Sequence, residues 1–129
     1  EIERVLSFTN QTLGSGADAA IYTSRSLVSG SDAASSLEIG RIVSESLVEI
    51  VSSITHQPRY LVAKGGITSS DIATKALGIK RAMVIGQALP GVPAWRCGEE
   101  TRYPGMTYIV FPGNVGEDEA LAQIVKKID

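Results

Sequence analysis

One segment in the middle of the chain reads Tyr60-Leu61-Val62-Ala63-Lys64-Gly65-Gly66-Ile67-Thr68-Ser69-Ser70-Asp71. It opens with a short apolar run of the length that a buried strand needs, and the paired glycines end that run. Apolar residues then recur at helical spacing until Gly78, at Ile72, Ala73, Ala76 and Leu77. The segment therefore predicts a strand, a glycine turn and a helix in direct succession, as in the units from which α/β sheets are built.

Similar elements are predicted on both sides of this segment. Upstream, the pattern indicates a helix over residues 2–13, a short strand over 19–23, a Ser/Gly-rich loop over 24–36 and a long helix over 37–55. Ser35 and Glu38 have the spacing of a capping box for the long helix. Downstream, we expect strands at 82–85 and 108–111, a turn at 89–93 with a hairpin return at 94–97, and a last helix with an apolar face at 121–128.

Strands that are apolar throughout and alternate with helices favour a layered α/β/α domain. Its central sheet is predicted to be mostly parallel, and mixed where the hairpin interrupts the alternation. The 129 residues suit one domain over residues 1–129. Because the chain starts at Glu1 inside a helical pattern, we expect it to be a piece of a longer protein.

Composition excludes several classes of protein. The net charge of −2 does not suit a strongly basic nucleic-acid-binding or membrane-surface domain. No apolar run reaches the ~20 residues of a membrane span. A single cysteine, Cys97, forms no internal disulfide, and with His56 as the only histidine there is no cluster for structural zinc. A reducing, cytoplasmic location is the corresponding expectation.

Two glycine turns are the strongest candidates for a binding site. The first is Lys64–Asp71, and the second is Pro112-Gly113-Asn114-Val115-Gly116-Glu117. Each follows a predicted strand, where α/β sheets bind their ligands. Paired glycines let the backbone approach a ligand closely, and the N-terminus of the next helix favours phosphate. Nearby donors and charges are those of Thr68, Ser69, Lys64 and Lys75.

The two turns differ in charge. Glu117, Asp118 and Glu119 follow the second turn, in the predicted first turn of the last helix, and would repel a phosphate. We therefore assign phosphate to the first turn. The second turn either contacts a base or ribose through its backbone or helps to hold Mg²⁺ with its acids. A purely structural turn remains the alternative, since neither segment matches a Walker A motif, a dinucleotide fingerprint or a nucleophile elbow.

Other candidates favour structural roles. His56 is expected to stabilise a helix end, and Cys97 to be inert. Trp95 is expected to pack within the hairpin rather than to stack on a base. Thr23-Ser24-Arg25, after the first predicted strand, is a candidate third wall of the site.

The two glycine turns, taken with Ile85-Gly86-Gln87-Ala88-Leu89-Pro90-Gly91-Val92-Pro93 and Tyr22-Thr23-Ser24, resemble the four-carbon acid sugar kinase family. The similarity is to the C-terminal nucleotide-binding domain of these ATP-dependent kinases and covers nearly the whole chain. It implies a larger two-domain enzyme, with the sugar acid and the catalytic base mainly on an N-terminal domain. Many members carry a polar or acidic residue where this chain has Ile67.

The resemblance implies ATP and Mg²⁺ as cofactors and transfer of the γ-phosphoryl group to a sugar-acid hydroxyl. The predicted nucleotide contacts are Gly65, Gly66, Ile67, Thr68, Ser69, Gly113, Asn114 and Gly116; no catalytic or protein metal-ligand residue is assigned. The alternatives are a non-catalytic module that binds a small anion or a partner protein, or the kinase-like part of a multifunctional fusion enzyme. Whether the chain forms a homodimer is left open by the sequence.

Overall fold

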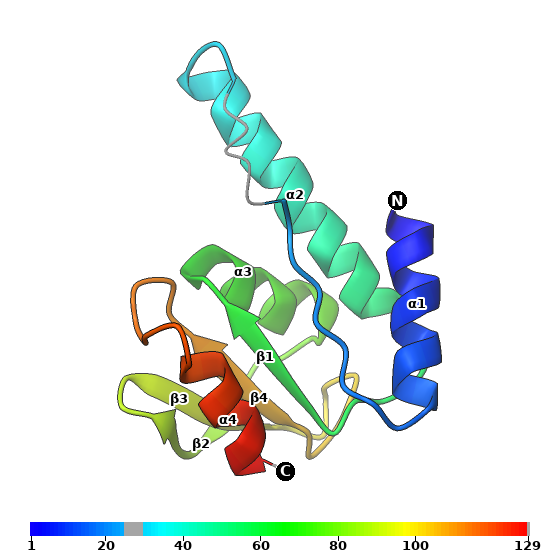
Figure 1. Cartoon of the computed structure of the whole chain (residues 1–129), viewed down its shortest axis with the longest axis vertical. Coiled ribbons are helices and arrows are strands. Elements are labelled where there is room, and N and C mark those ends of the chain that lie inside the picture. The colour runs from blue at the N-terminus through cyan, green and yellow to red at the C-terminus, as the bar shows by residue number, and fades with distance from the viewer. Residues whose placement is uncertain (25–29, 129) are drawn as a thin grey trace. The chain divides into compact units, whose positions relative to one another are not determined.

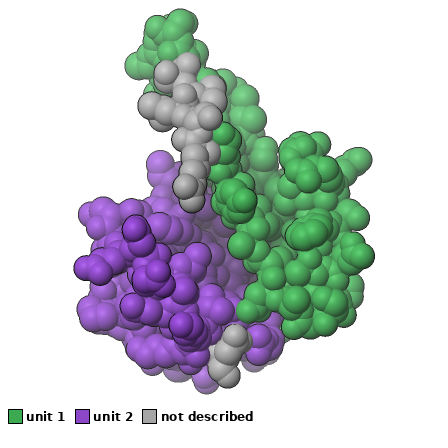
Figure 2. All heavy atoms as spheres, in the orientation of Figure 1, with its two compact units in different colours: residues 1–57 green, residues 58–129 purple. Residues whose placement is uncertain are grey.

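The computed structural model describes residues 1–24 and 30–128, and it divides the chain into two compact units, residues 1–57 and 58–129 (Figures 1 and 2). The first unit contains α1 (Ile2–Gly14) and α2 (Ala33–Ser53). The second contains β1 (Tyr60–Lys64), α3 (Gly66–Asp71), the π-helical segment η1 (Ile72–Ala76), β2 (Ala82–Leu89), β3 (Val92–Cys97), β4 (Thr107–Phe111) and α4 (Ala120–Ile128). The single domain over residues 1–129 stays a prediction.

The long helix of the first unit begins earlier than predicted. Its N-cap is Asp32, whose carboxylate accepts a hydrogen bond of 2.8 Å from the backbone N–H of Ser35. The Ser35 hydroxyl in turn accepts from the backbone N–H of Asp32. The capping box thus lies three residues upstream of the predicted Ser35–Glu38 box, because Ser35 closes it at its third position rather than opening it.

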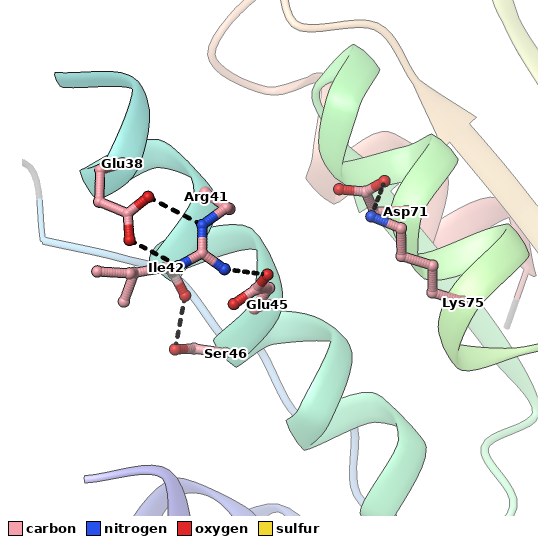
Figure 3. A network of polar contacts seen from close by, with 7 residues as sticks. All are labelled: Glu38, Arg41, Ile42, Glu45, Ser46, Asp71 and Lys75. Atoms are coloured by element: carbon pink, nitrogen blue, oxygen red, sulfur yellow. Dashed lines mark hydrogen bonds and ion pairs between the residues drawn. The ribbon is translucent and has the colours of Figure 1, made fainter. Parts of the chain in front are cut away.

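Charged side chains stabilise the exposed surface of α2. Arg41 bridges Glu38 and Glu45, one turn away on either side (Figure 3). Such pairs at spacings of three and four residues add only a few tenths of a kcal/mol each to a helix. The predicted apolar face is buried only near the C-terminal end of the helix, at Ile50 and Val51, whereas Ile42 is 51% exposed.

Replacing the N-cap gives a first testable expectation. Hydrogen bonds from Ser35 lower the pKa of the Asp32 carboxyl, so the folded state favours the charged form. Asp32→Ala should lower the unfolding temperature at pH 7, measured by circular dichroism. Because the pKa is depressed in the folded state, this loss should be complete above the ordinary value of 3.8 and should shrink as the pH falls below it, towards the lowered pKa of the folded state. Asp32→Asn, which keeps a capping oxygen, should stay close to the parent chain at pH 7.

The predicted strand at 19–23 is wrong. Residues 17–24 have no regular secondary structure, and Tyr22 is 84% exposed. A strand needs a partner for its backbone groups, and the sheet is made only of β1 to β4 among the described residues. Arg25, the last residue of the proposed third wall, lies outside the described residues, as does the rest of the segment 25–29 of the predicted loop at 24–36.

The sheet is mixed, with the strand order β1-β4-β3-β2. β1 and β4 are parallel, and β4 pairs antiparallel with β3, which forms the predicted hairpin with β2. The α/β class and the mixed sheet are confirmed, but antiparallel pairs outnumber the parallel one. The hairpin is the reason: β3 returns between β2 and β4, so it runs against both neighbours. Its turn is tight, with Gly91 at a φ of 79°.

The two faces of this sheet are covered by different helices. Side chains alternate along β4, so Tyr108 and Ile109 point to opposite faces. The Tyr108 hydroxyl donates to the backbone carbonyl of Ser69, which places α3 on its face. Ile109 and Phe111 belong to an apolar cluster with Ile124 of α4. The second unit is therefore the layered α/β/α arrangement predicted from the sequence.

Candidate functional site

The two glycine turns meet at one edge of the sheet. β1 and β4 are parallel neighbours, and their last residues, Lys64 and Phe111, lie opposite each other. The Gly65 N–H donates to the Phe111 carbonyl at 2.8 Å. A Cβ atom on Gly113 would lie only 3.8 Å from the Gly65 Cα. The structure thus brings together two segments that are separated by almost fifty residues in the sequence.

The first turn presents backbone donors at the start of α3. Gly65 has a φ of +107°, a conformation that favours glycine, and its carbonyl accepts the N–H of Ser69 at 2.9 Å. This is the first bond of the helix, so the N–H groups of Gly66, Ile67 and Thr68 have no acceptor within it. Gly66 and Ile67 are exposed, and Ile67 retains 77% of its accessible surface. These donors and the helix dipole suit an anionic group.

Ser69 has a different position from the one predicted. Its side chain is buried, and its hydroxyl donates inward to the Ala63 carbonyl at 2.7 Å. Its own carbonyl accepts from the Tyr108 hydroxyl at 2.6 Å. Ser69 therefore holds α3 against β1 and β4 and supports the turn from below. The sequence predicted that the Ser69 hydroxyl lies near the turn. It could not show that the hydroxyl points into the protein rather than towards a ligand.

Removing the Tyr108 hydroxyl tests this support. Burial raises the pKa of Tyr108, so the hydroxyl stays protonated and donates over the whole physiological range. We expect Tyr108→Phe to reduce the free energy of unfolding by about 0.5–1.5 kcal/mol, because the buried Ser69 carbonyl loses its side-chain donor but keeps the backbone N–H of Ile72. Urea denaturation measures this loss. Tyr22→Phe, at an exposed tyrosine, should leave stability unchanged within about 0.5 kcal/mol; equal effects at both tyrosines would contradict the supporting role.

Lys64 and Lys75 both have partners. The Lys64 ammonium donates to the Pro112 carbonyl at 3.4 Å and lies over the Phe111 ring, 4.1 Å from its centroid. It therefore connects the two turns and leaves a positive charge beside them. Lys75 of η1 forms an ion pair of 3.0 Å with Asp71, one turn earlier at the end of α3 (Figure 3). Of the two lysines considered, Lys64 is the one placed at the glycine turns.

The second turn consists of an exposed part and a packed part. Gly113 and Asn114 are exposed beside the first turn. Gly116 has a φ of +85°, and a Cβ there would lie 2.8 Å from the Ala120 Cβ and 2.9 Å from the Phe111 Cζ. Its lack of a side chain is therefore required for packing. We therefore infer that Gly116 is needed for packing, and that only the exposed backbone near Gly113 is available to a ligand.

The acids after the second turn lie outside α4. They were expected in its first turn, but the helix begins at Ala120, whose N–H donates to the Glu117 carbonyl at 3.0 Å. Glu117, Asp118 and Glu119 are exposed. Within the described part of the chain, no group of three or more His, Cys, Asp or Glu side chains is arranged to hold a metal ion.

A groove that the sequence analysis did not predict begins at the first turn. It has a volume of about 420 Å³ and extends from Gly66 along one side of α3 and η1. Trp95 and Val84 of the hairpin contribute to its lining, as do Lys80 and Arg81. Trp95 pairs with Val84 in the hairpin and packs on Tyr108 of β4 with ring centroids 6.0 Å apart, but it is only partly buried, so the predicted packing leaves part of the ring open to the groove. Trp95 lies in a groove because of the way β2, β3 and β4 pair, and this pairing cannot be predicted from the residues next to Trp95.

The surroundings of Cys97 and His56, the remaining candidates, favour structural roles for both. Cys97 is buried, and burial raises the pKa of its thiol, which disfavours the nucleophilic thiolate. The His56 ring lies against Gly14 at the end of α1, since a Cβ on Gly14 would be 3.1 Å from Nε2. No helix among the described residues has the length and apolarity needed to cross a membrane.

An α/β unit with two glycine turns at the ends of parallel strands defines a candidate phosphate- or nucleotide-binding domain. Comparison with known families agrees: residues 1–121 match the family described as nucleotide-binding C-terminal domain, and the chain belongs to this family. The resemblance to the C-terminal domain of four-carbon acid sugar kinases is confirmed at this level. No curated protein matches the chain.

Solved structures share the fold. The Haemophilus influenzae protein HI1011 superposes with a TM-score of 0.67 at 15% sequence identity, over 100% of this chain and 34% of that one. A domain of unknown function from Bordetella bronchiseptica, crystallised with citrate as a domain-swapped dimer, gives a TM-score of 0.62 at 21% identity, over 96% of this chain and 30% of that one. The chain thus spans about a third of the length of each of these proteins.

Proposed function

We propose that this chain is the ATP-binding part of a kinase that phosphorylates four-carbon sugar acids with Mg·ATP. The observation that carries the proposal is the meeting of Gly65 and Gly113 at the carboxyl ends of β1 and β4. Membership of a family of nucleotide-binding C-terminal domains supports the same reading. The choice of a sugar acid as substrate and of ATP as the nucleotide rests on the resemblance of the sequence to the kinases.

The phosphates of the nucleotide are assigned to the first turn. The N–H groups of Gly66, Ile67 and Thr68 would donate to phosphate oxygens, and Lys64 would add positive charge. Gly113 and Asn114 would close the other side through the backbone. Mg²⁺ in such sites is held largely by phosphate oxygens and water, so it needs few protein ligands. The exposed acids 117–119 are the nearest carboxylates in the sequence to the second turn.

In the proposed reaction, an acceptor hydroxyl attacks the γ-phosphorus in line while the ADP oxygen leaves. Catalysis of this kind depends mainly on positioning and charge neutralisation. Mg²⁺ would supply part of that neutralisation when bound with the nucleotide. The acceptor and its base are assigned to parts of a longer enzyme beyond this chain, which we place in the cytoplasm. By itself, the 129-residue chain is therefore expected to bind nucleotide without phosphorylating a tetronate.

Calorimetric titrations of the chain with different anions test this proposal. We expect Mg·ADP to bind more tightly than sulfate or a sugar phosphate, because only the nucleotide uses backbone contacts at both turns. If sulfate or the sugar phosphate binds as tightly as Mg·ADP, the chain is a small-anion module and the kinase proposal is wrong.

A further inference from the structure

The groove beside α3 is continuous with the first glycine turn. Gly66, at the head of α3, belongs to both. From there the groove follows Ser70 and Thr74 to the loop at Ile79–Arg81. Its volume of about 420 Å³ lies within the range of small-molecule sites. A ligand bound by its charged end at the turn therefore has an adjoining space for an uncharged part.

The shape of the groove follows from the topology of the second unit. On this face of the sheet, α3 contacts β1 and β4. Val84, Trp95 and Tyr108 lie in register across the hairpin and β4, so their side chains share this face. Tyr108 is completely buried by the helix, whereas Val84 retains 66% of its accessible surface. Within this unit the helix thus covers one half of the face and leaves an apolar shelf beside it.

The far end of the groove is held in place by a carboxylate. One oxygen of Glu100 accepts the backbone N–H groups of Lys80 and Arg81, at 3.3 Å and 3.2 Å. These contacts fix the backbone of the loop, and both cationic residues line the groove. The lining thus combines a flat aromatic and aliphatic floor, hydroxyl groups on the helix side and positive charge at one end.

We infer that this groove receives the base and ribose of the nucleotide whose phosphates lie at the first glycine turn. The inference rests on the proposed function and specifies where the rest of the ligand goes. A nucleobase is flat and stacks on aromatic rings, and cations at the rim add attraction to its π face. Ser70 and Thr74 offer hydroxyl oxygens to ribose or to base N–H groups. A second copy of the chain is a less suitable occupant, because the hydroxyls and the shared Gly66 match a small polar ligand.

Trp95 makes this arrangement directly measurable, because it is the only tryptophan in the chain. Mg·ADP should change the Trp95 fluorescence saturably, with the same midpoint as binding measured by calorimetry. Magnesium pyrophosphate, which has no base, should bind at the glycine turn and leave the fluorescence unchanged.

A matched pair of variants on β2 separates stacking from a general effect of charge. Val84 lines the groove, whereas its neighbour Met83 is 67% exposed and points to the opposite face of the strand. Val84→Glu should weaken Mg·ADP binding by about tenfold, because a carboxylate on the apolar shelf would displace the base from Trp95 and one base stack contributes about that much. It should leave pyrophosphate binding within about twofold of the parent chain, and Met83→Glu should leave both ligands within the same limit.

The possible outcomes distinguish this inference from the function on which it rests. Suppose that ADP and pyrophosphate both bind, but the Trp95 fluorescence does not change and Val84→Glu does not alter the ADP affinity. The base then lies elsewhere, and only the inference about the groove is wrong. If neither ligand binds, the proposed nucleotide site is wrong as well. If Val84→Glu changes the mass measured by light scattering and leaves ADP affinity intact, the shelf is an interface between copies and the inference is overturned.

Discussion

Gly66→Val and Gly113→Val are each expected to reduce the affinity for Mg·ADP by about 100-fold or more while the chain stays folded. At Gly66 a Cβ would meet no atom within 4 Å, and at Gly113 it would lie 3.8 Å from the Gly65 Cα, an ordinary contact. Neither glycine has a positive φ. Added side chains would therefore fit the protein. At Gly66 the side chain would occupy the space through which phosphate oxygens reach the backbone N–H groups, and at Gly113 it would block the backbone contact proposed for the second turn.

Calorimetry gives the affinity in this experiment, and circular dichroism shows that each variant is folded. Gly40→Val is the matched control, since Gly40 lies in a helix outside the site and a Cβ there also meets nothing within 4 Å. It should bind Mg·ADP like the parent chain. A folded Gly66→Val variant with unchanged affinity would show that the first turn does not hold the phosphates.

Gly116→Ala is expected to have the largest effect on stability, reducing the free energy of unfolding by about 3 kcal/mol or more. The positive φ of +85° is unfavourable for any residue with a side chain, and the new Cβ would lie 2.8 Å from the Ala120 Cβ and 2.9 Å from the Phe111 Cζ. Both neighbours belong to the apolar cluster around α4, so neither can move without disturbing the core. Urea denaturation measures the change.

Gly105→Ala separates the two contributions to this loss. Gly105 has a φ of +79°, close to that of Gly116, but a Cβ there meets nothing within 4 Å. We expect it to lose about 1–2 kcal/mol from backbone strain alone. Equal losses in both variants would mean that packing against Phe111 and Ala120 does not contribute.

Local patterns in the sequence were sufficient to predict the elements that form the site. The apolar run at 60–63, the glycines after it and the helix that follows are all present. The hairpin was predicted from the turn at Pro90 and Gly91, and Leu89 does pair with Val92. These predictions succeed because strand length, glycine turns and helical spacing depend on neighbouring residues.

The pairing of distant strands was not predictable from the same patterns. β4 follows the hairpin in sequence, yet it lies between the hairpin and β1. This order brings Gly113 to Gly65, and it also puts Trp95 beside Tyr108 on the face that α3 half covers. The apolar run at 19–23 shows the opposite error. Its residues suit a strand, but among the described residues the sheet contains only β1 to β4, so β propensity alone did not form a strand there.

An amide NMR titration of the chain with Mg·ADP tests most directly whether the two turns form one nucleotide site. The largest shifts should occur together at residues 65–68 and 113–114, with a single midpoint, while the amides of α1 stay in place. Shifts confined to one of the two turns, or no shift at either turn at millimolar nucleotide, would show that the turns do not form one nucleotide site.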